Sequence, residues 1–381
     1  MRDKWSPRGG ILFAEQPRTV DVVVVGGGPA GSAAALTLRR HGGHSVMLLE
    51  QREYAREKVG ETLSPGVLPL LDYLGVGEHF RQAGFSPSFA FTAAWGDSEV
   101  RARDFLFTGR GHGWHLDRTR FDAGLANAAR SMGAQLLTGV RVRELGRDGD
   151  TWRLRVDGLE ASPEVRCRYL IDATGRSAWL ARALGASRLQ QDHLVGISAY
   201  YAASDSVVEG CSLVEATASG WWYSAPVPDG RLITVLMTDA DLLQASHDDR
   251  EYFWSTALAQ APNTRARLGE RPMAGNLRVW PAHSQHLEPC CGKGWAAAGD
   301  AVAAFDPLSS MGIGYALSTG IQSARLAAIS LANASHEAEQ CQAYRSDIQR
   351  HVMEYQALKR GYYQVESRYA DQPFWIRRQA A

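Results

Sequence analysis

Three glycines and one acidic residue near the start of the sequence are spaced as in a dinucleotide site. The run Gly26-Gly-Gly28-Pro-Ala-Gly31 fits the pattern G-x-G-x-x-G, and Glu50 follows it. In such a motif Gly26 permits a tight turn, Gly28 lets the backbone approach a pyrophosphate, and Gly31 lets a helix pack closely on a strand. Glu50 can accept a hydrogen bond from a ribose hydroxyl, which favours NAD or FAD over NADP. These residues predict that the chain binds a dinucleotide.

The segments around the glycines have the composition that the motif requires. Residues 22–25 are all valine, which is typical of a buried parallel strand, and residues 45–49 form a second apolar strand that leads into Glu50. Between them we expect a helix of small residues over 32–40. The N-terminus of that helix would offer unpaired N–H groups and a positive dipole end to phosphates. A glycine-rich turn that arose by chance would lack this order of strand, motif, helix, strand and acid.

The composition narrows the classes of partner. The 381 residues include 41 Lys and Arg and 41 Asp and Glu, so nothing in the net charge indicates nucleic acid or a membrane surface as a partner. The five cysteines have neither metal-ligand spacing nor the pattern of a disulfide framework. No apolar run approaches the roughly 20 residues of a membrane span, and residues 1–20 lack the features of a signal peptide. We expect a cytoplasmic protein with no metal site and no stable membrane span.

Two further motifs follow in the chain. An apolar strand over 169–172 runs into Asp172-Ala-Thr-Gly175-Arg-Ser177, and a short strand over 294–298 runs into Gly299-Asp300. The second motif continues as FDPLSSMGIG over 305–314 and then as a helix of small residues over 315–332. A charged helix over 336–359 and an aromatic, basic tail from Gly361 complete the sequence.

Taken in this order, the three motifs resemble the p-hydroxybenzoate-hydroxylase-like FAD enzymes. That group includes aromatic monooxygenases, flavin-dependent halogenases and geranylgeranyl reductases, and the resemblance spans about residues 20 to 335. It implies an α/β fold in which a Rossmann-like FAD-binding lobe is interleaved with a mostly antiparallel sheet lobe that binds the substrate. The expected organisation is an extension at 1–20, an FAD lobe at 21–80, 112–185 and 286–335, a sheet lobe at 81–111 and 186–285, and a C-terminal helix and tail at 336–381.

The resemblance also implies which residues surround FAD. Asp300 would hold the ribityl chain, although an aspartate at this place could also be an ordinary helix N-cap. Gly312-Ile313-Gly314 would present backbone N–H groups to the flavin ring and stabilise its reduced form. The expected cofactor-binding residues are Gly26, Gly28, Pro29, Ala30, Gly31, Glu50, Gln51, Arg118, Val142, Asp172, Gly175, Asp300, Pro307, Gly312, Ile313 and Gly314.

Two segments, KVGETLSP over 58–65 and GWWYSAP over 220–226, look most like the halogenase-related branch of this group. Halogenases of this type use a lysine from the segment after the G-E motif, but no lysine lies between Val59 and Gly292 in this sequence. In tryptophan halogenases a glutamate occupies the position that corresponds to Ser309. These departures disfavour halogenation.

The C-terminal pattern, which includes Tyr362-Tyr363 and Pro373-Phe374-Trp375, resembles a different subgroup. Its members mature tryptophylquinone enzymes, as do the lysine-oxidase and glycine-oxidase maturation factors. This resemblance implies hydroxylation of a tryptophan side chain within a protein substrate. The alternative is that these aromatic residues simply pack the last helix against the body of the protein.

An apolar aromatic cage would suit an indole or phenol ring. Trp221, Trp222 and Tyr223 are the candidates for its walls, and Phe305 is the candidate for a roof beside the flavin. Aromatic residues on a sheet are also common in cores, so packing is the alternative for this set.

Glu61 is the candidate catalytic residue, as a base toward an indole N–H. Its carboxylate could instead pair with Lys58 or Arg56. His115 and His193 are further acid–base candidates, and for both a structural role is the alternative.

The expected reaction is hydroxylation of an indole-like substrate through a flavin C4a-hydroperoxide, with O2 as a substrate. The substrate could be a tryptophan of a partner protein during maturation of a quinone cofactor. The sequence has no second G-x-G-x-x-G, so NADH or NADPH would dock beside the flavin, or a partner reductase would deliver free reduced flavin. The alternatives are a small-molecule hydroxylase or halogenase-like enzyme, a geranylgeranyl-type reductase, and a flavin-bearing assembly factor without turnover.

Overall fold

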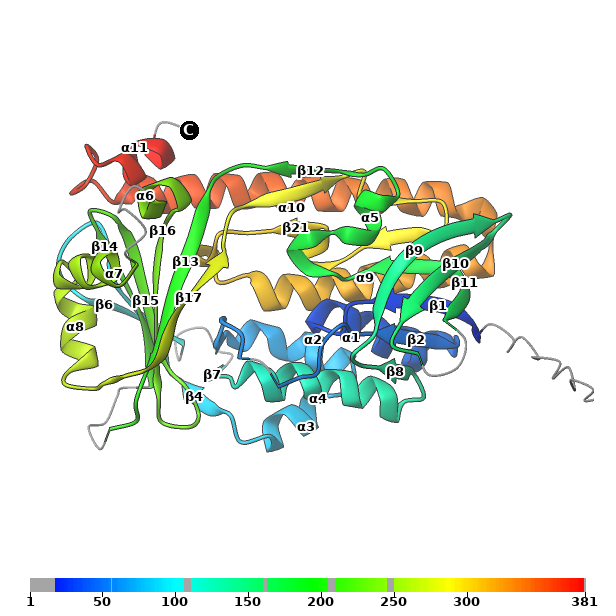
Figure 1. Cartoon of the computed structure of the whole chain (residues 1–381), viewed down its shortest axis with the longest axis horizontal. Coiled ribbons are helices and arrows are strands. Elements are labelled where there is room, and N and C mark those ends of the chain that lie inside the picture. Colours follow the sequence, from blue (N-terminus) through cyan, green and yellow to red (C-terminus); the bar gives the residue numbers. More distant parts are fainter. Residues whose placement is uncertain are drawn as a thin grey trace, which may run out of the picture.

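The protein is elongated, with a large sheet at each end and one long helix that runs along both (Figure 1). A computed structural model describes residues 18–55, 57–105, 111–159, 163–204, 210–244 and 250–379. Among these residues, no helix is long and apolar enough to cross a lipid bilayer. The combination of parallel and antiparallel sheets with packed helices confirms the expected α/β class.

The first large sheet is organised around β1 (Arg18–Val25). This strand pairs in parallel with β11 (Glu164–Asp172) on one side and with β2 (Val46–Leu49) on the other. Its valines are buried on both faces, which explains why the strand is a continuous apolar run. The sheet also contains β8 (Gln135–Leu137), β9 (Arg141–Asp148), β10 (Thr151–Asp157), β19 (Cys291–Gly292) and β20 (Trp295–Ala297).

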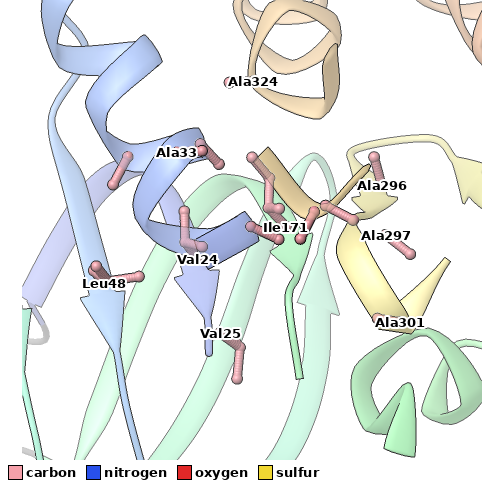
Figure 2. Close-up of a cluster of buried hydrophobic side chains, with 14 of the residues drawn as sticks. Val24, Val25, Ala33, Leu48, Ile171, Ala296, Ala297, Ala301 and Ala324 are labelled. Atoms are coloured by element: carbon pink, nitrogen blue, oxygen red, sulfur yellow. The ribbon is translucent and has the colours of Figure 1, made fainter. Parts of the chain in front are cut away.

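Small side chains let two helices pack closely beside this sheet. Figure 2 shows Ala33 of α1 (Pro29–Thr37) above the strand residues Val24 and Ile171. On α9 (Gly312–Ala332), a Cβ atom at Gly320 would lie 2.3 Å from the carbonyl oxygen of Ala30. The two helices therefore touch through their backbones, at the first turn of α1 and the middle of α9.

The second large sheet has the strand order β17-β13-β16-β15-β14-β5-β6. Each pair of adjacent strands in this sheet is antiparallel except β14 and β5, which are parallel. It is therefore the mostly antiparallel sheet that we expect. The strands are β5 (Ala90–Ala94), β6 (Arg101–Asp104), β13 (Leu194–Tyr201), β14 (Cys211–Thr217), β15 (Gly220–Pro226), β16 (Leu232–Asp239) and β17 (Met273–Pro281).

Each large sheet and the helices packed on it form one body of the protein. Two small sheets and several short helices connect these two bodies. One small sheet contains β3 (Thr62–Leu63), β7 (Gly113–His115) and β4 (Ser86–Ser88), and the other contains β12 (Ser187–Gln190), β18 (Gln285–Glu288) and β21 (Ala303–Ala304). The remaining α-helices are α2 (Leu68–Tyr73), α3 (Gly77–Gln82), α4 (Arg118–Ser131), α5 (Trp179–Ala183), α6 (Ala240–Gln244), α7 (Arg250–Ala259) and α8 (Pro262–Leu268).

The C-terminal aromatic residues belong to the core. Helix α10 (Glu337–Val365) runs along both sheets, and α11 (Pro373–Gln379) packs beside the second one (Figure 1). Phe374 and Trp375 are fully buried, and the Trp375 indole N–H donates to the carbonyl of Thr217 at 2.8 Å. These two rings therefore pack the last helix against the body of the protein, and this packing does not exclude the resemblance of the tail to the maturation factors.

Candidate functional site

The glycine-rich turn has the geometry that its sequence predicts. Gly26 has a φ of +109°, and a Cβ atom there would lie 2.1 Å from the carbonyl oxygen of Ala173. At Gly31 a Cβ atom would lie 1.8 Å from the carbonyl oxygen of Gly26. At Gly28 a Cβ atom would meet no atom within 4 Å. The fold therefore requires the first and third glycines, while the middle glycine faces open space.

That open space lies at the N-terminus of α1. The amide of Ser32 donates to the carbonyl of Gly28 at 2.9 Å and so begins the helical hydrogen-bond ladder. The N–H groups of Ala30 and Gly31 come before this ladder, and Pro29 at the first helical position has no N–H to satisfy. Such a helix end is suited to an anion, so the turn fits a pyrophosphate.

Glu50 is held by the same turn. One carboxylate oxygen accepts from the amide of Gly27 at 2.7 Å, and the other accepts from the amide of Arg52 at 3.0 Å. The hydroxyl of Tyr54 donates to the Gly27 carbonyl at 2.7 Å, a contact that the sequence did not indicate. Gln51 follows Glu50 in an exposed bend. This end of the turn is thus ordered around the acid expected to bind a ribose.

A cavity of about 360 Å³ lies next to these residues, and Tyr54, Asn127 and Leu136 are among those that line it. Val142, in β9, is buried in the core. We therefore expect Val142 to meet a cofactor through its backbone and not through its side chain.

Asp172, an expected cofactor residue, has a side chain that is engaged within the protein itself. Its side chain is fully buried, and both oxygens accept hydrogen bonds, one from the amide of Thr174 in the following loop at 2.9 Å and one from the amide of Ala181 in α5 at 2.7 Å. Burial raises the pKa of this carboxyl group. The Asp172 side chain therefore shapes the loop that contains Gly175.

Asp300 lies in the short 3-10 helix η5 (Gly299–Ala301). Ala298 is the N-cap of this helix, so the N-cap interpretation of Asp300 is wrong. The side chain is 40% exposed, and one carboxylate oxygen lies 3.5 Å from Nε of Arg176. The amide of Gly299 donates to the Thr319 hydroxyl of α9 at 2.8 Å, which places Asp300 beside both helices of the dinucleotide site.

Gly312, Ile313 and Gly314 form the first turn of α9. The amide of Tyr315 donates to the carbonyl of Met311 at 2.9 Å, so the N–H groups of the three preceding residues come before the helical ladder. Gly312 is exposed, and a Cβ atom there would meet no atom within 4 Å. Pro307, in the 3-10 helix η6 (Pro307–Ser309), is also exposed. The backbone donors expected to face a flavin ring are therefore grouped at one helix end.

Glu61 is a buried acid where the two large bodies meet. Its side chain is 1% exposed, and one oxygen lies 3.5 Å from the hydroxyl of Tyr200, which β13 contributes. The other oxygen accepts from the amide of Gly60 at 3.0 Å. Burial raises the pKa of Glu61 to about 7, and Arg118 opposes this shift. A carboxyl group with this pKa can both accept and return a proton near neutral pH.

Lys58 pairs with a different acid, Asp122. Its ammonium group lies 2.7 Å from the buried carboxylate of Asp122, which also contacts Arg118 at 3.2 Å. Arg118 in turn donates to the carbonyl of Val59 at 3.0 Å. This ion-pair cluster fixes the loop before Glu61, and it rules out Lys58 as the partner of Glu61. Arg56, the other suggested partner, lies outside the described residues.

Among the aromatic candidates, Tyr223 contacts the residue that follows Glu61. Its hydroxyl is 2.7 Å from the hydroxyl of Thr62, the residue that follows Glu61, and Thr62 also lies 3.4 Å from Nδ1 of His115. Burial lowers the pKa of His115 to about 4, so this imidazole is neutral at physiological pH. His193 is exposed beside Gln190 and is not part of this group.

The other three aromatic candidates are not brought together. Strand alternation places Trp222 on the opposite face of β15, where its ring packs against Trp254 with centroids 4.7 Å apart. Trp221 is 1% exposed beneath the C-terminal helices. Phe305 packs between Tyr315 and Tyr355 at 4.6 and 4.4 Å in the core of the first body. A cage built from all four side chains is therefore wrong.

Trp222→Ala should accordingly be a stability variant. We expect it to lose about 3–5 kcal/mol of unfolding free energy, because it removes a fully buried indole from a packed layer. Urea unfolding measures the loss, and Tyr252→Ala on the neighbouring α7, whose side chain is 66% exposed, is the control that should change little. A Trp222→Ala protein of normal stability but without turnover would contradict the placement of Trp222 in the core.

Sequence reasoning missed several residues of this site. Asp122 could have been found, because it follows Arg118 by four positions on α4, a spacing that favours an ion pair. Tyr200 and Tyr54 gave no comparable signal, because their contacts join segments far apart in the sequence.

Comparison with known proteins is consistent with this geometry. The family described as FAD binding domain matches residues 19–359. The putative FAD-dependent oxidoreductase LodB of Marinomonas mediterranea is 31% identical over 363 residues, which cover 94% of this chain and 97% of LodB. A tryptophan 2-halogenase of Chondromyces crocatus is 26% identical, over 96% of this chain and 72% of the relative.

Solved structures agree at the level of the fold. The flavin-dependent halogenase CmlS superposes with a TM-score of 0.86 at 24% identity, over 96% of this chain and 68% of CmlS. QhpG, described as a peptidyl tryptophan dihydroxylase essential for tryptophylquinone cofactor biogenesis, superposes with a TM-score of 0.77 at 28% identity, over 96% of this chain and 79% of QhpG. The chain, with its glycine-rich turn at the N-terminus of α1, belongs to the FAD-binding-domain family and is an FAD-dependent oxidoreductase related to the flavin-dependent halogenases and monooxygenases.

Proposed function

We propose that this protein hydroxylates a tryptophan side chain of a partner protein, with FAD as cofactor and O2 as a substrate. The observation that carries the proposal is the buried Glu61, whose pKa of about 7 suits a base for an indole N–H. The likeness to LodB along almost the whole chain supports an FAD-dependent oxidoreductase, and the likeness to a peptidyl tryptophan dihydroxylase supports a protein substrate.

FAD would be held by the residues that fit its parts. The N-terminus of α1 would bind the pyrophosphate, Glu50 the ribose of the adenosine, Asp300 the ribityl chain, and the first turn of α9 the flavin ring. When bound, FAD supplies the activation of O2. NADH, NADPH or free reduced flavin from a partner reductase would supply the electrons.

The chain's own residues would then prepare the indole. Glu61 accepts the indole proton, and its place 3.5 Å from the Tyr200 hydroxyl fixes the direction in which the carboxylate points. The hydroxyls of Tyr223 and Thr62 lie 2.7 Å apart and so fix the segment that follows Glu61. Glu61 is 1% exposed, so its proton does not exchange freely with bulk water.

The test uses the tryptophan-bearing precursor of a tryptophylquinone enzyme as the substrate. We expect O2-dependent addition of oxygen to one tryptophan, seen by mass spectrometry as a shift that increases further with heavy-isotope O2. A buffer that contains chloride or bromide serves as the halogenation arm, and halide incorporation would refute hydroxylation. Stable binding of the precursor without consumption of reductant would instead identify an assembly factor.

A further inference from the structure

Asp306 is a buried acid that the proposed reaction does not use. It lies just before η6 and is 1% exposed. One carboxylate oxygen accepts from the amide of Leu308 at 2.9 Å, and the other accepts from the hydroxyl of Tyr363 at 2.7 Å. The Asp306 amide donates to the hydroxyl of Tyr355 at 2.8 Å. Two tyrosines of α10 therefore hold this residue by both its backbone and its side chain.

Tyr363 is itself held from several sides. Its ring is fully buried, and its hydroxyl accepts from the indole N–H of Trp221 at 3.0 Å. The Arg378 guanidinium lies 5.4 Å from the ring centroid, and the ring of Trp375 lies 5.8 Å away. The hydroxyl that reaches Asp306 is thus positioned by the second sheet and by α11 together.

The segment between Asp306 and α9 carries backbone strain. Ser310 has a φ of +52°, which is unfavourable for a residue other than glycine and persists where the surroundings determine the conformation. The segment ends at Met311, the N-cap of α9. Its conformation therefore sets where the N–H groups of Gly312, Ile313 and Gly314 lie.

We propose that Tyr363 is a positioning residue for the flavin. Through Asp306 it fixes the strained segment before α9, and so it fixes the backbone donors that favour the negatively charged reduced flavin over the oxidised form. The C-terminal helices would thereby tune the reduction potential from outside the FAD-binding turn. The proposal rests on the flavin ring lying at the first turn of α9, as proposed above.

The test is the midpoint potential of bound FAD in Tyr363→Phe, with Tyr362→Phe as the matched control. Tyr362 is the neighbouring residue and is 37% exposed. In Tyr363→Phe we expect FAD to bind about tenfold more weakly in the reduced state relative to the oxidised state. For a two-electron couple this lowers the midpoint potential by about 30 mV. The control should keep the wild-type potential.

Three results would overturn the inference. The first is a wild-type potential in Tyr363→Phe, and the second is an equal loss of affinity for both redox states, which would indicate a purely structural role. If Tyr363→Phe does not fold, Asp306→Asn replaces it, because this change alters the same contact and keeps the side-chain shape. An unchanged potential in that variant is the third result.

A second variant, Gly312→Ala, tests whether the flavin ring lies at the first turn of α9, independently of the role of Tyr363. The added methyl group meets no protein atom within 4 Å, so it changes the potential or the visible flavin spectrum only if the ring lies there. If Gly312→Ala and Tyr363→Phe are both silent, the placement fails. If Gly312→Ala alone has an effect, only the role of Tyr363 fails.

Discussion

Gly28→Ala is expected to remove most FAD binding while leaving the apoprotein folded. The Cβ atom of this alanine would enter the open space at the N-terminus of α1, where no protein atom lies within 4 Å. The backbone φ of −73° suits any residue, so the unfolding free energy should change by about 1 kcal/mol or less. We expect the dissociation constant of FAD to rise about 100-fold, which is roughly 2.7 kcal/mol. Quenching of flavin fluorescence measures the affinity.

Gly31→Ala is the control, in which we expect the stability of the apoprotein to change. Its Cβ atom would lie 1.8 Å from the carbonyl oxygen of Gly26, so the apoprotein itself should be destabilised. Thermal unfolding of the two apoproteins distinguishes them. If Gly28→Ala binds FAD with wild-type affinity, the pyrophosphate does not lie against this turn.

Glu61→Gln is expected to lower kcat by about 10² to 10⁴-fold and to leave FAD bound, because the amide keeps the shape of the side chain but cannot take a proton. In the wild type, kcat should rise with pH through about 7 as the carboxylate forms, and the variant should lose this dependence. Glu57→Gln is the control, because Glu57 pairs with Arg231 and Arg278 on the surface side of the same loop. A Glu61→Gln enzyme with normal kcat would exclude Glu61 as the base.

The raised pKa of Glu61 also makes the stability of the folded protein depend on pH, and Glu61→Gln should weaken this dependence. The pKa of Glu61 is raised from 4.5 to about 7, so between these values the folded state holds a proton that the unfolded state has lost. Unfolding free energy therefore falls as pH rises across this window, by about 3 kcal/mol in all for this group. Denaturant unfolding at several pH values should show this slope in the wild type and a shallower one in Glu61→Gln.

The parts of the site that the sequence predicted are local. Gly26, Gly28 and Gly31 lie within one turn, and their spacing alone determines which of them must lack a side chain. Gly312 to Gly314 were placed at a flavin by resemblance, and the structure puts them at a helix N-terminus that begins three residues earlier than the pattern of small residues indicated. Short-range backbone geometry is what a sequence motif records.

The parts that the sequence did not predict depend on pairing between distant segments. The aromatic run at 221–223 looked like one wall, but alternation along β15 sends Trp222 to the far face, and only the position of the C-terminal helices decides that Trp221 is covered. Asp172 belongs to a recognisable motif, yet its burial and its hydrogen bond to Ala181 show that it supports the loop. No spacing rule separates a residue that contacts a ligand from one that holds such a residue in place.

The order of strands in the first sheet also determines how this protein can be made. Strand β1, at residues 18–25, lies next to β11, and β11 takes its other parallel neighbour from β20 at residues 295–297. The sheet beside the glycine-rich turn therefore stays incomplete during synthesis until residue 297 has left the ribosome. Pairings between such distant segments slow folding, and a shorter chain that ends before residue 295 would leave β11 without β20. The sheet that carries the glycine-rich turn is therefore complete only in a nearly finished polypeptide.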